Sequence, residues 1–197
     1  MRKLALAFAT LLVSTAALAQ TTMGTIANNP APAASAPAAA AVSQYKDPEN
    51  TLLLQLKDGI VVIQLRPDLA PVHVARVKEL ARKGFYDGLV FHRVIEGFMA
   101  QGGDPTGTGT SGSGKSLPDE FSTAHFVRGT IGAASAGPNT SDSQFFICFA
   151  PAGFLDGKYT IWGQVVSGMQ YVDNIKRGEP PVNPDKIITL RVASDVK

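Results

Sequence analysis

Short apolar runs, separated by turns that glycine or proline marks, dominate the chain between residues 51 and 192 and constrain its fold most. The first two runs flank Asp58-Gly59, a dipeptide that readily takes the positive φ angles of a tight hairpin turn. Each run is as short as an ordinary strand and rich in residues that favour strands. Eight strands are therefore expected, at 51–56, 60–65, 89–95, 98–101, 130–134, 144–149, 160–166 and 187–192.

Only two segments show the spacing of an amphipathic helix. In 71–83 apolar residues recur at helical intervals, Pro71 suits a first turn and Gly84 ends the pattern. In 169–177 the apolar residues again lie on one side, and Gly178 follows. So many strands with two helices cannot alternate into an α/β sheet. The pattern favours a mainly β protein, a barrel whose ends the helices cover, since closure removes exposed sheet edges.

The N-terminus has the features of a secretory signal peptide, residues 1–19. Arg2 and Lys3 form a basic start, 4–16 is apolar and uncharged, and Ala-Leu-Ala supplies the small-x-small pattern before the cleavage point. An uncleaved membrane anchor is the alternative, but 4–19 is shorter than the roughly 20 residues that cross a hydrocarbon core. We therefore expect export without stable membrane insertion. The signal has a bacterial character, so the periplasm is the expected location and secretion from the cell the alternative.

Residues 20–46 differ in composition from the rest of the chain. From Gln20 to Tyr45 there is no charged residue, and 30–41 consists of Pro, Ala and a single Ser. Such a segment has no large side chains to bury, and its prolines prevent the alanines from joining into one helix. A disordered tether over 20–46 is expected, followed by one folded domain over 47–197.

Composition disfavours several classes of function. The chain has 18 Lys and Arg against 16 Asp and Glu, so loss of Arg2 and Lys3 would leave a formally neutral protein. Since no basic stripe with interleaved aromatic residues occurs, no nucleic-acid binding is expected.

Cys148 is the one cysteine, which excludes an intrachain disulfide and suits a buried small hydrophobe. The three histidines lack short metal-ligand spacing, so neither a metal nor a cofactor is expected, and nothing indicates more than a monomer.

Two glycine patterns imitate nucleotide-binding loops. Residues 107–112 fit the spacing of a dinucleotide loop, and 109–116 fit that of a P-loop. Both kinds of site need a helix N-terminus directly after the loop to hold the phosphate, and Leu117-Pro118 follows instead. A glycine-rich surface loop is the preferred interpretation, with nucleotide binding as a rival.

Three blocks of sequence carry a resemblance to a known family. FHRVIEGFMAQGGD at 91–104 and ASAGPNTSDSQFFI at 134–147 closely resemble the two signature blocks of the cyclophilin family of peptidyl-prolyl cis/trans isomerases. FLDGKY at 154–159 is similar to the third block, and the resemblance extends over about 50–192. It implies an eight-stranded antiparallel closed β-barrel capped by two α-helices. It also implies an enzyme that rotates X-Pro bonds in proline-containing polypeptides.

The chemistry of that reaction can be argued from Arg93. An X-Pro bond prefers trans by only about 0.5–1 kcal/mol, yet it must cross a barrier of about 18–20 kcal/mol because rotation destroys amide resonance. No bond breaks, so the enzyme must bind the proline and favour the twisted amide over both planar forms. The twisted prolyl nitrogen gains a lone pair, to which a fixed charged donor can hydrogen-bond. Arg93 is the candidate for this donor.

The resemblance implies roles for further residues. Gln101 would act beside Arg93 by holding the substrate backbone. Strand alternation agrees in part, because Met99 and Gln101 share a face, whereas Phe98 would need a bend near Gly97. The expected substrate-binding residues are Phe98, Met99, Phe146 and Leu155 around the proline ring, Ala134, Ser135, Ala136 and Gln144 along the groove, and Phe154 and Tyr159 near the rim.

Three positions depart from the commonest family pattern. Phe154 stands where many members have Trp, Tyr159 where many have His, and Ser135 where many have Asn. Without the indole N–H, we expect weaker binding of the family's cyclic-peptide immunosuppressant but retained isomerase activity. The expected function is an exported isomerase that assists folding of exported proteins. The alternative is a proline-peptide-binding chaperone or scaffold without turnover, and Arg93 discriminates between the two.

Overall fold

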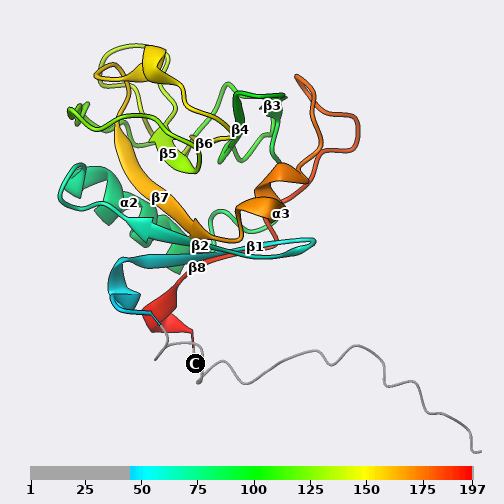
Figure 1. Ribbon diagram of the computed structural model, residues 1–197, viewed down its shortest axis with the longest axis horizontal. Helices are drawn as coiled ribbons and strands as arrows, with labels where there is room; N and C mark the ends of the chain where they lie inside the picture. The colour runs from blue at the N-terminus through cyan, green and yellow to red at the C-terminus, as the bar shows by residue number, and fades with distance from the viewer. Residues whose placement is uncertain (1–44, 197) are drawn as a thin grey trace, which may run out of the picture. The chain divides into compact units, whose positions relative to one another are not determined.

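Eight antiparallel strands form one curled sheet in residues 45–196, the part of the chain that the computed structural model describes (Figure 1). The strand order is β3-β4-β6-β5-β7-β2-β1-β8. The predicted number of strands is confirmed. The strands are β1 (Thr51–Leu56), β2 (Gly59–Leu65), β3 (Arg93–Ile95), β4 (Met99–Gly102), β5 (Thr130–Ala133), β6 (Phe145–Cys148), β7 (Ile161–Ser167) and β8 (Thr189–Val192).

Closure of the barrel is less complete than expected. The order begins at β3 and ends at β8, and no ladder joins these two strands. The gap is crossed by an isolated bridge between Val90 and Lys186, both of which precede the strands proper. The reason lies on the outer edge of β3, where Val94 pairs with Gly178 instead of with β8. The expected closed barrel is therefore a curled sheet that strand pairing does not close, and backbone hydrogen bonds between 88–91 and 185–187 span its opening.

The first hairpin differs from the prediction by one residue. Leu56 pairs with Gly59, so Lys57 and Asp58 make the turn and Gly59 opens β2. A Cβ atom at Gly59 would lie 2.5 Å from the ring of Tyr171, which packs over this point from the helix Met169–Asp173. Glycine is therefore needed here because an aromatic ring approaches the backbone closely.

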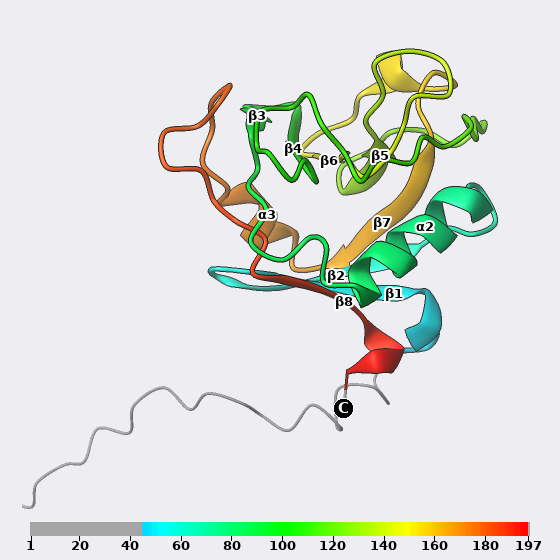
Figure 2. The ribbon, with the colours of Figure 1, turned by 180° about the vertical axis from the view of Figure 1, so that it is seen from behind.

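Two α-helices pack against the sheet, α2 (Pro71–Arg82) against β8 and β7, and α3 (Met169–Asp173) against β2. Figure 2 shows them apart from each other, with α2 beside β7. The predicted first helix is confirmed. The second is shorter than the expected 169–177, because the backbone N–H of Lys176 donates to Asp185 and Arg177 hydrogen-bonds to the last carbonyl groups. Among residues 45–196, no helix combines the length and hydropathy that a membrane span needs.

The apolar interior consists of two clusters. The larger lies between the sheet and the helices and contains Trp162, Phe91 and Phe145. The smaller gathers around Phe146 and includes Met99, Phe126, Cys148, Ala152, Leu155 and Ile161. Cys148 is fully buried, and burial raises the pKa of its thiol to about 12, as suits the expected small hydrophobe.

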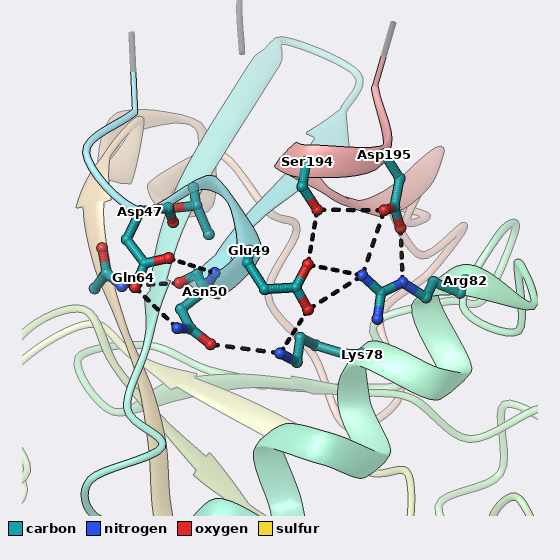
Figure 3. A network of polar contacts seen from close by, with 9 residues as sticks. Asp47, Glu49, Asn50, Gln64, Lys78, Arg82, Ser194 and Asp195 are labelled. Carbon is teal, nitrogen blue, oxygen red and sulfur yellow. Dashed lines mark hydrogen bonds and ion pairs between the residues drawn. The ribbon is translucent and has the colours of Figure 1, made fainter. Parts of the chain in front are cut away.

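Three short 3-10 helices complete the fold, η1 (Pro48–Asn50), η2 (Gly153–Leu155) and η3 (Ala193–Asp195). Polar contacts join η1 and η3 to the C-terminal part of α2 (Figure 3). The predicted signal peptide, 1–19, and all but the last two residues of the predicted tether, 20–46, lie outside the described residues. Both remain predictions.

Candidate active site

A cavity of about 600 Å³ opens beside β3 and β4 and brings most of the predicted site residues together. It is lined by Arg93, Phe98, Met99, Gln101, Ala134, Ser135, Phe146, Phe154, Leu155 and Tyr159. Of the residues predicted for the site, Ala136 and Gln144 do not line this cavity. They line a neighbouring one of about 540 Å³, which shares Gln101, Ala134 and Ser135 with the first.

Strand register aligns the polar and apolar parts of the site. Arg93 on β3 is the cross-strand partner of Gln101 on β4, and Gln101 is the partner of Phe146 on β6. Directly paired residues project to the same face of a sheet. The guanidinium, the amide and the phenyl ring therefore form one row across three neighbouring strands.

The floor of the cavity is apolar and rigid. Met99, Phe146 and Leu155 are 1%, 5% and 7% exposed. The Phe146 ring stacks on Phe126 with centroids 5.7 Å apart and meets the edge of Tyr159 at 5.9 Å. A ring held by two aromatic neighbours keeps its orientation, so the floor presents a preformed surface to a small apolar ring.

Two phenylalanines form the rim of the cavity. Phe98 precedes β4 and falls outside the strand alternation, because Gly97 turns the chain with a φ of +69°. This is the bend that the sequence required. The Phe98 ring lies 5.2 Å from that of Phe154, which is 62% exposed. Phe154 thus lies at the mouth of the cavity, at the position where many family members have Trp.

A chain of polar side chains follows the row of paired residues. Nε of Arg93 donates to Glu179 at 2.8 Å, and its Nη1 lies 3.5 Å from the side-chain oxygen of Gln101. Nε2 of Gln101 donates to Gln144 at 3.0 Å. Gln144 in turn donates to the backbone oxygen of Ser111 at 2.7 Å. Arg93 therefore keeps terminal N–H groups on the cavity wall while its Nε is engaged from outside.

Comparison with known families agrees with this geometry. The family model of the cyclophilin type peptidyl-prolyl cis-trans isomerases matches residues 51–192. The chain belongs to the cyclophilin family. The predicted enzyme class, a peptidyl-prolyl cis-trans isomerase, is thereby confirmed.

Individual relatives of this cyclophilin cover most of its length. It is 52% identical over 169 residues to a probable peptidyl-prolyl cis-trans isomerase of Brucella suis, covering 77% of this chain and 86% of that one. It is 43% identical over 145 residues to an isomerase of Schizosaccharomyces pombe, covering 68% of this chain and 94% of that one.

Solved cyclophilin structures share the fold. One from Hirschia baltica has a TM-score of 0.69 at 28% identity, with 77% of this chain and 76% of that one covered. One from Cryptosporidium parvum, determined in the presence of the dipeptide Ala-Pro, has a TM-score of 0.68 at 30% identity, with 72% and 98% covered.

The glycine-rich stretch of this cyclophilin is a loop, as expected, and it is organised by Asp104. The Asp104 carboxylate is fully buried and accepts hydrogen bonds from the backbone N–H groups of Thr106, Gly109 and Ser111 at 2.7, 2.6 and 3.2 Å. Burial alone would raise the pKa of Asp104, but these hydrogen bonds outweigh it and lower the pKa to about 2. The loop therefore holds its shape around an ionised carboxylate and lines the second cavity with Gly109 to Gly112.

Sequence reasoning missed three residues that shape the site. Asp104 could have been found as the start of an Asx turn, two residues before Thr106. Gly132 on β5, where a Cβ atom would clash with the rings of Phe146 and Phe126, could have been found as a glycine inside a strand, which often marks a close approach. Glu179 carries no local signal, because it lies 86 residues from Arg93 in the sequence.

Within residues 45–196, no group of three or more His, Cys, Asp and Glu side chains is arranged to hold a metal ion.

Proposed function

We propose that this cyclophilin rotates the X-Pro bonds of proline-containing polypeptides at the cavity of about 600 Å³. The observation that carries the proposal is the row of Arg93, Gln101 and Phe146, which sets a charged donor beside an apolar floor. The Cryptosporidium parvum cyclophilin structure determined with Ala-Pro supports a proline-containing ligand for this family member too.

In the proposed mechanism the proline ring lies on Met99, Phe146 and Leu155. A terminal N–H of Arg93 donates to the prolyl nitrogen as the amide twists, an interaction that the planar amide offers only weakly. Gln101 holds the substrate backbone next to the twisting bond. Because rotation about the X-Pro bond breaks no covalent bond, no proton transfer is needed.

The test is an Arg93→Ala variant assayed on a proline peptide. Loss of one preorganised donor typically lowers kcat by about 100-fold or more, and we expect a loss of this size with peptide binding retained. A variant that binds and isomerises the peptide as fast as the wild type would contradict the catalytic role of Arg93. A wild-type protein that binds the peptide without accelerating its isomerisation would be the chaperone or scaffold alternative. Arg93→Lys should retain little isomerase activity, since lysine lacks the planar donor geometry.

We further propose that residues 1–19 are a cleaved signal, that 20–46 act as a tether and that the mature protein assists folding of exported proteins in the periplasm as a monomer. The basic start and the Ala-Leu-Ala junction support this proposal. Mass spectrometry of the protein from fractionated cells should give an N-terminus at Gln20 in the periplasmic fraction. A cytoplasmic protein that begins at Met1 would contradict export, and light scattering would test the monomer.

A further inference from the structure

Glu179 contacts the guanidinium on which the proposed mechanism depends. We propose that Glu179 is a positioning residue that orients Arg93 in the cavity. The inference rests on the proposed function, because it gives Glu179 a role only if Arg93 acts on the substrate.

The atom that Glu179 binds explains how it would act. Its Oε2 accepts from Nε of Arg93 at 2.8 Å, whereas Nη1 of Arg93 lies at the long distance of 3.5 Å from Gln101. Nε belongs to the planar guanidinium, so a short hydrogen bond there restricts rotation of the whole plane. The terminal nitrogens lie at the other end of that plane, where Nη1 makes only the long contact with Gln101 and can turn to a substrate. A bond at Nε can thus orient the donors without consuming them.

The carboxylate is itself held in place relative to β3. Val94 and Gly178 exchange two backbone hydrogen bonds of 2.8 Å, one residue away from Arg93 and from Glu179. Gly178 has a φ of +144°, and a Cβ atom there would lie 2.6 Å from the Cα of Pro181, so the segment folds tightly back on itself. These backbone contacts fix the position of the Glu179 backbone relative to β3. Its side chain therefore approaches Arg93 from a defined direction.

Fold stability does not explain the pair. The side chains of Arg93 and Glu179 are 43% and 51% exposed, and ion pairs that are this accessible contribute little to stability. Solvent also screens the charge of Glu179, which limits how far it can weaken the positive charge of Arg93. Orientation is more sensitive, since a displacement of about 1 Å can cost roughly 100-fold in rate. Glu179 should therefore influence the rate more through the orientation of Arg93 than through the charge of Arg93.

A matched control pair joins the same two segments. Nε of Arg177 donates to Glu96 at 2.8 Å, the same geometry as in the Arg93 pair. Arg177, however, lies over the ring of Phe149 at 4.2 Å and does not line the cavity. Variants of Glu96 thus remove an equivalent surface ion pair without touching the proposed donor.

The experiment compares Glu179→Ala, Glu179→Gln, Glu96→Ala and Glu96→Gln with the wild type on one proline peptide, measuring kcat and KM separately. Glu179→Ala should lower kcat by about 5- to 20-fold with KM within twofold, since Arg93 acts on the twisted amide more than on the ground state. Glu179→Gln keeps an oxygen acceptor for Nε and should recover most of the rate. Both Glu96 variants should stay within twofold of the wild type.

Two further measurements make the outcome unambiguous. In an Arg93→Ala background, Glu179→Ala should cause no additional loss, because the two residues act through one group. By NMR, the Nε–H of Arg93 should exchange faster with water in Glu179→Ala and remain unchanged in Glu96→Ala. This second readout does not depend on activity.

Three results would overturn the inference. An unchanged kcat in Glu179→Ala would remove any positioning role, and a raised kcat in both Glu179 variants would make Glu179 an attenuator of charge. Additive losses in the Arg93→Ala background would indicate an effect that does not pass through Arg93. If Arg93→Ala alone keeps full activity, the proposed function fails first. If Arg93→Ala is inactive and Glu179→Ala is not affected, only the positioning role fails.

Discussion

The ring of Phe146 occupies space that a side chain at position 132 would need. Gly132 on β5 is the cross-strand partner of Phe146, and a Cβ atom there would lie 2.4 Å from the tip of the Phe146 ring and 2.8 Å from Phe126. The glycine is thus what lets a large ring lie flat on the cavity floor. At the scale of single residues, the site depends on a missing side chain as much as on the residues that line it.

We expect Gly132→Ala to push the Phe146 ring toward the cavity. The variant should be less stable by about 1–3 kcal/mol, as is usual for an overpacked core. It should also bind proline peptides more weakly, because the displaced Phe146 ring would occupy part of the cavity. Thermal unfolding and peptide titration would check both effects. Gly137→Ala is the control, since no atom lies within 4 Å of the Cβ position there and stability should change little. Unaltered binding by Gly132→Ala would show that the ring is not held by the glycine.

At the scale of elements, the N-terminus of α2 is capped by a distant side chain. Ala70 precedes the helix and provides no side-chain hydrogen bond. Instead the two carboxylate oxygens of Glu120 accept from the N–H groups of Val72 and His73 at 3.0 and 2.9 Å. Nδ1 of the buried His73 lies 2.7 Å from the same carboxylate. The cap therefore ties the helix to the loop that precedes β5.

Glu120→Gln should weaken this cap. One carboxylate oxygen becomes an NH₂ group, which cannot accept from a backbone N–H and leaves that donor without its partner. We expect a loss of about 1–2 kcal/mol in the free energy of unfolding, the size of a lost cap. Chemical denaturation would measure it, with Glu96→Gln as the exposed control. Equal stability of the two variants would argue against a cap at Glu120.

At the scale of the whole domain, one acidic residue fastens both ends of the described chain to α2. Glu49 on η1 accepts from Lys78 at 2.8 Å and from Arg82 at 2.9 Å, both on α2, and from Ser194 on η3 at 2.9 Å (Figure 3). Arg82 also donates to Asp195 at 2.8 Å. The first and last described elements, η1 and η3, therefore both pair with Arg82 on α2.

Glu49 should make stability depend on pH. The hydrogen bond from Lys78, with those from Ser194 and Arg82, lowers the pKa of Glu49 from 4.5 to about 2. Because the pKa is lower in the folded state, the contribution is fully present above about pH 4.5 and is lost as the pH falls toward 2. The carboxylate is 49% exposed, so the contribution should be at most about 1 kcal/mol.

Thermal unfolding of Glu49→Gln between pH 7 and pH 2.5 would check this. The variant should be less stable than the wild type at pH 7, and the difference should shrink as the pH falls. Added salt should reduce the difference at pH 7 as well, because the groups are partly exposed. A difference that stays constant over the whole pH range would contradict the role of the charge.

The local patterns of the sequence determined most of the elements. Apolar runs bounded by turn residues predicted all eight strands, and helical spacing after Pro71 predicted α2, because periodicity and turn chemistry act between near neighbours. The signature blocks named the residues around the cavity, and the turn at Gly97 was required to bring Phe98 into it. Met99 and Gln101 share a face for the same local reason.

Contacts between distant segments were decided by tertiary structure alone. Gly178 rather than β8 covers the outer edge of β3, Glu120 caps a helix 48 residues before it, and Glu179 reaches Arg93 across 86 residues. The end of α3 at Asp173 likewise depends on a hydrogen bond from Lys176 to Asp185. None of these has a periodic signature, since a single polar contact depends on where two segments meet in space. The sequence thus defined the strands and the pocket residues, and only the folded chain determined what holds Arg93 beside them.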